Sequence, residues 1–155
     1  MRPLLLFLLA LLVFSPSLEA KKPKKPKEPK EPPPRAEQFL VPAKDSPAFK
    51  HYKQRSKNEI SKLLYLLERF HNTEFKVIYD GTTYDANTAI DLSRAYITQN
   101  YHGEKALSWI RINANRSTPK GAVIYMTFPN GKKRPLRDVL IEELAALEKI
   151  YQPLK

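Results

Sequence analysis

The segment 115–121 is the stretch in which groups suited to ligand binding are most concentrated. It reads Asn-Arg-Ser-Thr-Pro-Lys-Gly, which places hydroxyls, a guanidinium and backbone amides outside regular structure. Such a loop could hold an anionic or carbohydrate group. In the alternative, structural interpretation, Ser117 and Thr118 satisfy the last carbonyls of the preceding helix and start a strand. The candidate binding residues in and around the segment are Trp109, Arg116, Ser117, Thr118 and Tyr125.

No catalytic or metal-binding residues are predicted elsewhere. The histidines at positions 51, 71 and 102 share no metal-ligand spacing, and the chain has no cysteine. Glu142 and Glu143 are adjacent on a predicted helix, so they point about 100° apart and cannot share a substrate. No cofactor is therefore expected, and an enzymatic role is less favoured than a binding role.

The first 20 residues have the pattern of a cleavable signal peptide. Arg2 precedes an apolar run over 4–14, and Ala20 supplies a small residue at the expected cleavage point. The run is too short to span a bilayer, which needs roughly 20 apolar residues in a helix. We therefore expect a periplasmic or secreted protein. The absence of disulfides favours a bacterial envelope over a eukaryotic secretory route.

Residues 21–35 read KKPKKPKEPKEPPPR and predict a basic, proline-rich tether. Prolines at nearly every third position favour an extended polyproline II spacer without an apolar face. The tether either attaches the protein electrostatically to an anionic surface or serves as a stiff soluble spacer. The expected partners are an anionic envelope polymer, a membrane surface or another envelope protein, whereas export makes nucleic acid an improbable partner despite the net charge of +11. The lysines that would carry this electrostatic contact are Lys21, Lys22, Lys24, Lys25, Lys27 and Lys30.

The rest of the chain predicts an irregular lead-in over 36–55 and one small α+β domain over 56–155. Pro42 and Pro47 interrupt any helix in the lead-in. Ser56 and Glu59 have the spacing of a capping box and start an amphipathic helix that runs to Phe70. A strand over 75–79 then leads into the hairpin turn Asp80-Gly81 and a return strand over 82–84.

Two further helices and a second hairpin complete the predicted order α-β-β-α-α-β-β-α. Asp85 caps a helix to Asn100 that turns Ala89, Leu92 and Tyr96 inward, with Ile90 and Ile97 widening the apolar stripe. A helix over 104–113 follows, with Trp109 at its margin. The second hairpin comprises a strand over 122–128, the turn Asn130-Gly131 and a return strand over 132–134. In the last helix one face is formed by Leu140, Leu144, Leu147 and Tyr151. Segments 75–97 and 124–147 echo one another weakly, as a hairpin followed by a helix.

A family likeness lies in these same segments. Glu59-Ile60 at a helix start, Val77-Ile78-Tyr79-Asp80-Gly81 at the first hairpin, and 109–114 followed by the loop and Tyr125 resemble the YfeK-like group of small exported bacterial proteins of unknown function. The likeness covers roughly residues 58–147. Where the family tends to carry histidine before leucine, this chain has Asp91-Leu92, and Asn115 and Arg116 replace two loop serines. The resemblance implies export and the fold, and it implies no reaction.

Together these features predict a non-enzymatic binding or interaction module of the bacterial envelope, held near anionic surfaces by its tether. The alternative is a small periplasmic hydrolase whose site is built from loop residues. A cleft with a perturbed histidine or carboxylate would favour the hydrolase. A flat patch around Trp109 and Tyr125 would favour binding.

Overall fold

The computed structural model describes residues 31–151. The predicted signal peptide and the six tether lysines lie outside the described residues. The helices and strands belong to the compact unit Pro32–Lys155. None of the helices within 31–151 is long and apolar enough to cross a membrane.

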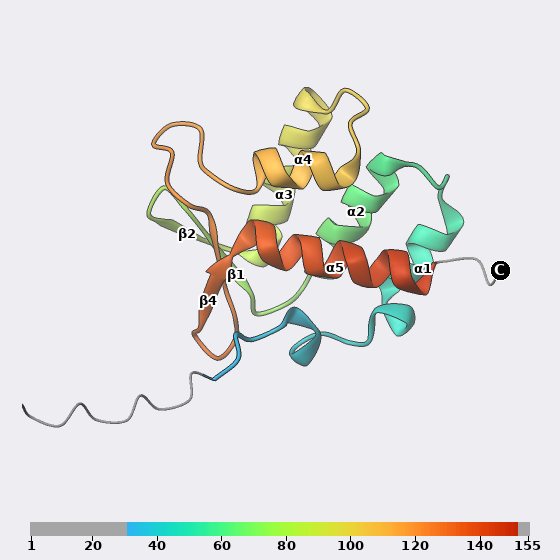
Figure 1. The fold of residues 1–155 in the computed structure, drawn as a ribbon, viewed down its shortest axis with the longest axis horizontal. Coiled ribbons are helices and arrows are strands. Elements are labelled where there is room, and N and C mark those ends of the chain that lie inside the picture. The colour runs from blue at the N-terminus through green and yellow to red at the C-terminus, as the bar shows by residue number, and fades with distance from the viewer. Residues whose placement is uncertain (1–30, 152–155) are drawn as a thin grey trace, which may run out of the picture. The chain divides into compact units, whose positions relative to one another are not determined.

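Two hairpin-helix units build the domain around one antiparallel sheet of order β2-β1-β3-β4 (Figure 1). The first unit comprises β1 (Lys76–Tyr79), β2 (Thr82–Asp85) and α3 (Ala86–Asn100), and the second comprises β3 (Tyr125–Thr127), β4 (Lys133–Pro135) and α5 (Leu136–Ile150). The two central strands join the units, with Val77 opposite Met126. The predicted α+β class with two hairpins is confirmed, and in both units the helix follows its hairpin without an intervening loop.

The two hairpins turn in different ways. Asp80 and Gly81 have φ angles of 51° and 83°, as a type I′ turn requires. In the second hairpin only Gly131, at φ 80°, is left-handed among the turn residues, because Pro129 cannot adopt a positive φ. Gly131 donates its N–H to the Phe128 carbonyl at 2.8 Å, and Phe128 donates to the Lys132 carbonyl at 2.9 Å. This pattern is a type I turn followed by a glycine bulge.

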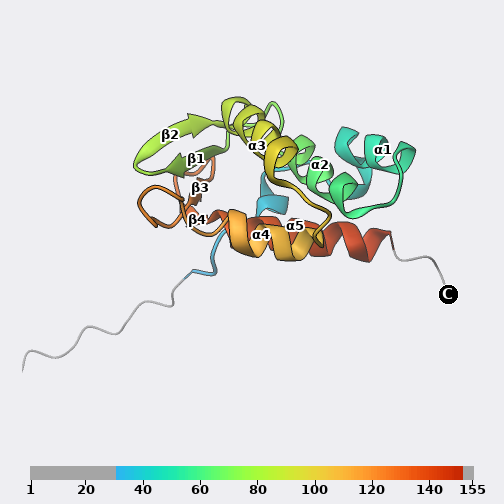
Figure 2. The same ribbon diagram turned by 90° about the horizontal axis from the view of Figure 1, so that it is seen from above.

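Helix α2 (Glu59–Arg69) lies at the centre of the helical layer, where it contacts α1 (Pro47–Gln54), α3, α4 (Ala106–Asn113) and α5. Seen from above in Figure 2, α3 and α2 lie on one side and α4 and α5 on the other. Helix α3 covers the first hairpin, and α5 covers the second. Ile90 of α3 and Val139 of α5 pack in one cluster with Met126, so both helices cover the same face of the sheet.

The expectation of an irregular lead-in over 36–55 is wrong. This segment forms two 3-10 turns, Ala36–Gln38 and Ala43–Asp45, and then helix α1. Pro47 is the first residue of α1, a position that tolerates proline because its N–H needs no helical partner. Ser46 caps the helix by accepting the Phe49 N–H at 3.1 Å. Ala48, Phe49 and Tyr52 are buried in the core, so the folded domain begins before residue 56.

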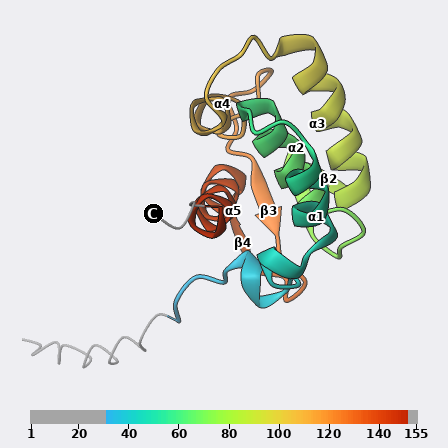
Figure 3. The ribbon, with the colours of Figure 1, turned by 90° about the vertical axis from the view of Figure 1, so that its right-hand side faces the viewer.

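The end of the predicted tether is also part of the fold. Pro34 is buried, and its carbonyl accepts a hydrogen bond from Arg134 Nη1 at 2.9 Å. The same guanidinium pairs with Glu142 through two bonds of 2.8 and 2.5 Å. Figure 3 follows the lead-in from this point past β4 towards α1.

Several predicted burial patterns and one predicted cap require correction. Asn58, rather than Ser56, caps α2 and accepts the Ser61 N–H at 3.0 Å. Trp109, predicted at a margin, is only 7% exposed. Tyr151, predicted on the inward face of the last helix, is 41% exposed and contacts Tyr52 by its ring edge.

A buried ion pair joins α2 to α5. Arg69 Nε donates to Glu143 Oε2 at 3.0 Å, and Arg69 Nη2 donates to the Val41 carbonyl at 2.5 Å. Burial raises the pKa of Glu143 above its usual value, against the opposing effect of the Arg69 charge. Glu142 pairs instead with Arg134, so the adjacent glutamates have separate structural partners, as their helical spacing predicts.

Candidate binding groove between α3 and α4

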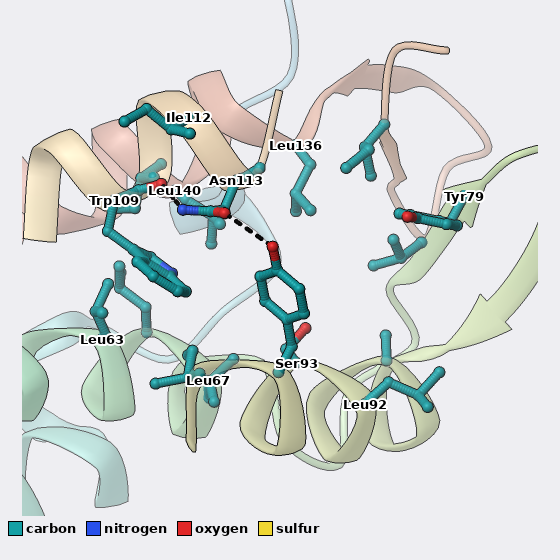
Figure 4. A pocket seen from close by; sticks show the side chains of 18 of the residues that line it. Leu63, Leu67, Tyr79, Leu92, Ser93, Trp109, Ile112, Asn113, Leu136 and Leu140 are labelled. Carbon is teal, nitrogen blue, oxygen red and sulfur yellow. Dashed lines mark hydrogen bonds between the residues drawn. The ribbon is translucent and has the colours of Figure 1, made fainter. Parts of the chain in front are cut away.

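An apolar groove of about 550 Å³ lies between α3 and α4, with the first hairpin at one end and α2 and α5 behind it (Figure 4). This volume falls within the range of small-molecule pockets. The lining side chains are mostly aliphatic: Leu63, Leu66, Leu67, Val77, Ala89, Leu92, Ile97, Ile110, Ile112, Ala114, Ile124, Leu136 and Leu140.

The α3 wall exists because this helix buries a different face from the one predicted. Ile90 and Ile97 anchor α3 in the core. Leu92 and Tyr96, expected inside, are 54% and 44% exposed, and with Ala89 they face the groove. A helix with two neighbouring apolar stripes can bury one and offer the other to a ligand.

An aromatic cluster and a side-chain bridge form the α4 end of the groove. The Trp109 ring lies 5.9 Å from the Tyr96 ring and 5.6 Å from the Tyr101 ring. The Tyr96 hydroxyl donates to Asn113 Oδ1 at 3.2 Å, and Asn113 Nδ2 donates to the Trp109 carbonyl at 3.1 Å (Figure 4). The first bond connects α3 to α4 across the groove, and the second fixes the Asn113 side chain on α4.

The opposite end is polar. The Tyr79 hydroxyl points into the cavity (Figure 4) and accepts the Thr118 N–H at 3.3 Å. Thr118 and Arg116 also line the groove. Arg116 Nη1 donates to the Gly121 carbonyl at 2.7 Å, which fixes the guanidinium against its own loop. The loop 115–121 thus contributes polar groups to an otherwise apolar cavity.

Ser117 has a different place from its two neighbours. Its side chain is buried, and its hydroxyl donates to Asp80 Oδ1 and accepts the Ala122 N–H at 3.1 Å. Ser117 N–H also donates to the Ala122 carbonyl at 2.8 Å. These bonds close the loop and attach it to the first hairpin turn. The structural interpretation therefore describes Ser117, although its partners are the turn and the loop rather than the end of α4.

Tyr125 does not join the groove. It lies opposite Ile78 in the sheet, on the face that points away from its neighbour Met126, and it is 38% exposed. Trp109 and Tyr125 therefore form no common flat patch. Of the predicted binding residues, the fold brings Trp109, Arg116 and Thr118 to one cavity.

Glu59 supports the α4 wall from outside. Lys105 precedes α4 without a side-chain cap, and Glu59 Oε2 of α2 accepts the Ala106 N–H at 2.8 Å instead. Glu59 also pairs with Lys62 at 2.8 Å. The hydrogen bond from Lys62 and the Ala106 N–H hold the pKa of Glu59 below its usual value.

Charge is sparse in the groove. Among its lining residues Arg116 is the single charged side chain, and none is a histidine, aspartate or glutamate. Within residues 31–151 no cluster of histidine and acidic side chains could hold a metal ion. The groove can therefore surround an apolar molecule and pair with one negative charge. Its lining residues include no histidine or carboxylate that could act as a general acid or base.

Sequence reasoning identified the loop and Trp109 but missed the rest of the groove. The sequence pattern predicts a strand position for Tyr79 and inward positions for Leu92 and Tyr96. The available signal was the unusual width of the apolar surface on the helix 85–100, which exceeds what one buried face needs.

Comparisons of the chain with models of protein families, with curated proteins and with solved structures found no match.

Proposed function

We propose that this protein is a non-enzymatic binding module that holds an elongated apolar molecule in the groove between α3 and α4. The observation that carries the proposal is the apolar stripe of α3 formed by Ala89, Leu92 and Tyr96, which faces a cavity of about 550 Å³. Apolar surface of this kind is stabilised when a ligand removes it from water. Ligand pockets in proteins typically combine an apolar lining with a few polar groups, as here.

The single tryptophan of the chain offers a direct test, because Trp109 forms part of the groove wall. We expect titration of the purified protein with 1-dodecanol, a neutral aliphatic probe, to change the Trp109 emission saturably. Ala89→Phe fills the groove and is expected to weaken this binding at least tenfold. Ala95→Phe, on the exposed side of the same helix, is the matched control and is expected to bind as the wild type does. Failure of dodecanol to bind, or equal effects of both variants, would contradict the proposal.

The alternative function, a small hydrolase, receives less support from the geometry. Ser117 and Lys120 have the Ser-x-x-Lys spacing of some acyl enzymes, but Ser117 is buried in a loop and its hydroxyl donates to Asp80. Glu143, whose pKa is raised, pairs with Arg69 and does not line the groove. Turnover of acyl or glycosyl ester substrates that is lost in Ser117→Ala, with the fold retained, would restore this alternative.

The cellular location in this proposal follows from residues 1–35. We propose export, cleavage after Ala20, and retention near an anionic envelope surface by the tether lysines. N-terminal sequencing of the mature protein should then begin at Lys21. Deletion of residues 21–33, which retains the buried Pro34, should abolish salt-sensitive retention on envelope material. Unchanged retention would leave the tether as a spacer.

A further inference from the structure

We propose that the ligand of the groove is a long-chain carboxylate, whose aliphatic chain lies between α3 and α4 and whose carboxylate pairs with Arg116. This inference rests on the proposed function and specifies its ligand class. It follows from the distribution of charge and polarity along the cavity.

The polar groups of the cavity are unequal in charge at its two ends. At the α4 end, Tyr96 and Asn113 are neutral and already bonded to each other. At the hairpin end, Arg116 supplies the one charge of the lining. A ligand that matches this cavity is therefore apolar over most of its length and carries a single negative charge at one end.

Arg116 is a free cation in the part of the chain that the structure describes. Its side chain makes one hydrogen bond there, from Nη1 to the Gly121 carbonyl at 2.7 Å, and no carboxylate of residues 31–151 lies within ion-pair distance. The two arginines beside the second hairpin differ from it: Arg134 pairs with Glu142, and Arg137 pairs with Asp138. An arginine remains charged at any physiological pH, so its unpaired charge favours an anion from solution.

The geometry of the guanidinium favours a carboxylate head group. The bond from Nη1 to Gly121 leaves Nε and Nη2, which form one edge of the planar group, without partners within residues 31–151. Two parallel N–H donors on one edge match the two oxygens of a carboxylate. The Tyr79 hydroxyl accepts the Thr118 N–H, so its own proton is available to the same head group.

The test compares dodecanoate with 1-dodecanol, which has the same chain and no charge, by Trp109 fluorescence on the full-length protein. We expect dodecanoate to bind at least tenfold more tightly than dodecanol, because a charge-assisted hydrogen bond contributes more than a neutral one. Arg116→Gln is expected to remove this advantage, so that the variant binds dodecanoate no more tightly than dodecanol. Arg116→Lys retains the charge without the two-donor edge and should give an intermediate affinity for dodecanoate.

Arg111→Gln provides the matched control, since Arg111 is an exposed arginine of α4 that does not line the groove. It should leave both affinities unchanged. Equal affinity of the wild type for the two probes, or an unaltered preference in Arg116→Gln, would overturn the carboxylate proposal while leaving the apolar groove intact. Binding of neither probe would overturn both proposals. A concentration-dependent dimer that closes the groove in the absence of probe would also overturn this inference in favour of a second copy of the chain.

Discussion

The two hairpin-helix units of the sheet have the same plan and opposite roles. Equivalent positions of the two units are the same number of residues apart along the chain. These pairs are Gly81 and Gly131 in the turns, Ala86 and Leu136 at the helix starts, and Asn100 and Ile150 at the helix ends. Yet α5 buries Val139, Leu144 and Leu147 together with the ion-paired Glu143. Helix α3 buries only Ala86, Ile90 and Ile97, and it leaves a second apolar stripe facing the groove.

The difference arises from what each helix packs against. Helix α5 contacts α2 and α4 as well as its own hairpin, whereas α3 packs mainly against α2 and its hairpin and meets α4 through Tyr96, across the groove. One unit therefore packs its helix more fully into the core, whereas the other leaves part of its helix on the groove. The following substitutions test this division, beginning with the largest expected effect.

The largest difference in the free energy of unfolding is expected between alanine variants of Glu143 on α5 and Ser93 on α3, which occupy matching positions of the two helices. Glu143→Ala leaves the Arg69 charge buried without its partner and should lower the free energy of unfolding by about 3–5 kcal/mol. Ser93→Ala, at the corresponding place on α3 in the groove lining, should change it by less than about 0.5 kcal/mol. Urea denaturation measures both. Comparable losses in the two variants would mean that α3 contributes to stability as α5 does.

The same leucine truncation should separate the two helices again. Leu144→Ala removes a fully buried side chain and should cost about 2–5 kcal/mol. Leu92→Ala removes an exposed one, so the midpoint of urea unfolding should hardly move while the affinity for dodecanol falls. If Leu92→Ala destabilises the protein and leaves dodecanol binding unchanged, then α3 belongs to the core.

Within the loop 115–121, Ser117 and Thr118 should separate structure from binding. Ser117→Ala removes the bond to Asp80 and an acceptor for the Ala122 N–H, and we expect it to cost about 1–3 kcal/mol. Thr118→Ala retains the backbone bond to Tyr79 and should be nearly neutral in thermal unfolding. Equal melting temperatures of the two variants would contradict this assignment.

The smallest effect concerns the cap that holds the α4 wall. The pKa of Glu59 is lower in the folded than in the unfolded state, so its stabilisation is present above the unfolded pKa, about 4.3, and is lost as the pH falls through the folded value. Glu59→Gln should cost less than about 1 kcal/mol at pH 7 and should flatten the decline of stability below pH 5. Parallel pH profiles for the variant and the wild type would exclude this contribution of Glu59.

The sequence predicted the elements whose signals are local. The Asp80-Gly81 pair predicts a turn with positive φ at both positions, and both have it. The long apolar periodicities predict the helices that form α2, α3 and α5. Helix α1 was missed because Pro47 was interpreted as an interruption, although a proline after a capping serine starts a helix equally well.

The groove depended on information that is not local. Periodicity predicted one wide apolar stripe on α3 with Leu92 and Tyr96 inward, whereas the core takes Ile90 and Ile97, because that choice depends on how the other elements pack against the helix. The fold likewise separates Trp109 from Tyr125. Alternate residues of a strand face opposite sides of the sheet, and Tyr125 lies on the side opposite to the buried Met126. Arg116 was identifiable as a candidate from its loop, whereas its isolation from carboxylates required the fold.

The two backbone contacts of the lead-in bear on how the domain responds to tension. A pull applied to the chain before Pro34 first meets the Arg134 bond to the Pro34 carbonyl and then the Arg69 bond to the Val41 carbonyl. Each guanidinium also pairs with a glutamate of α5, so part of the load passes into that helix. Neither arginine lines the groove, so breaking either bond removes no side chain from its lining.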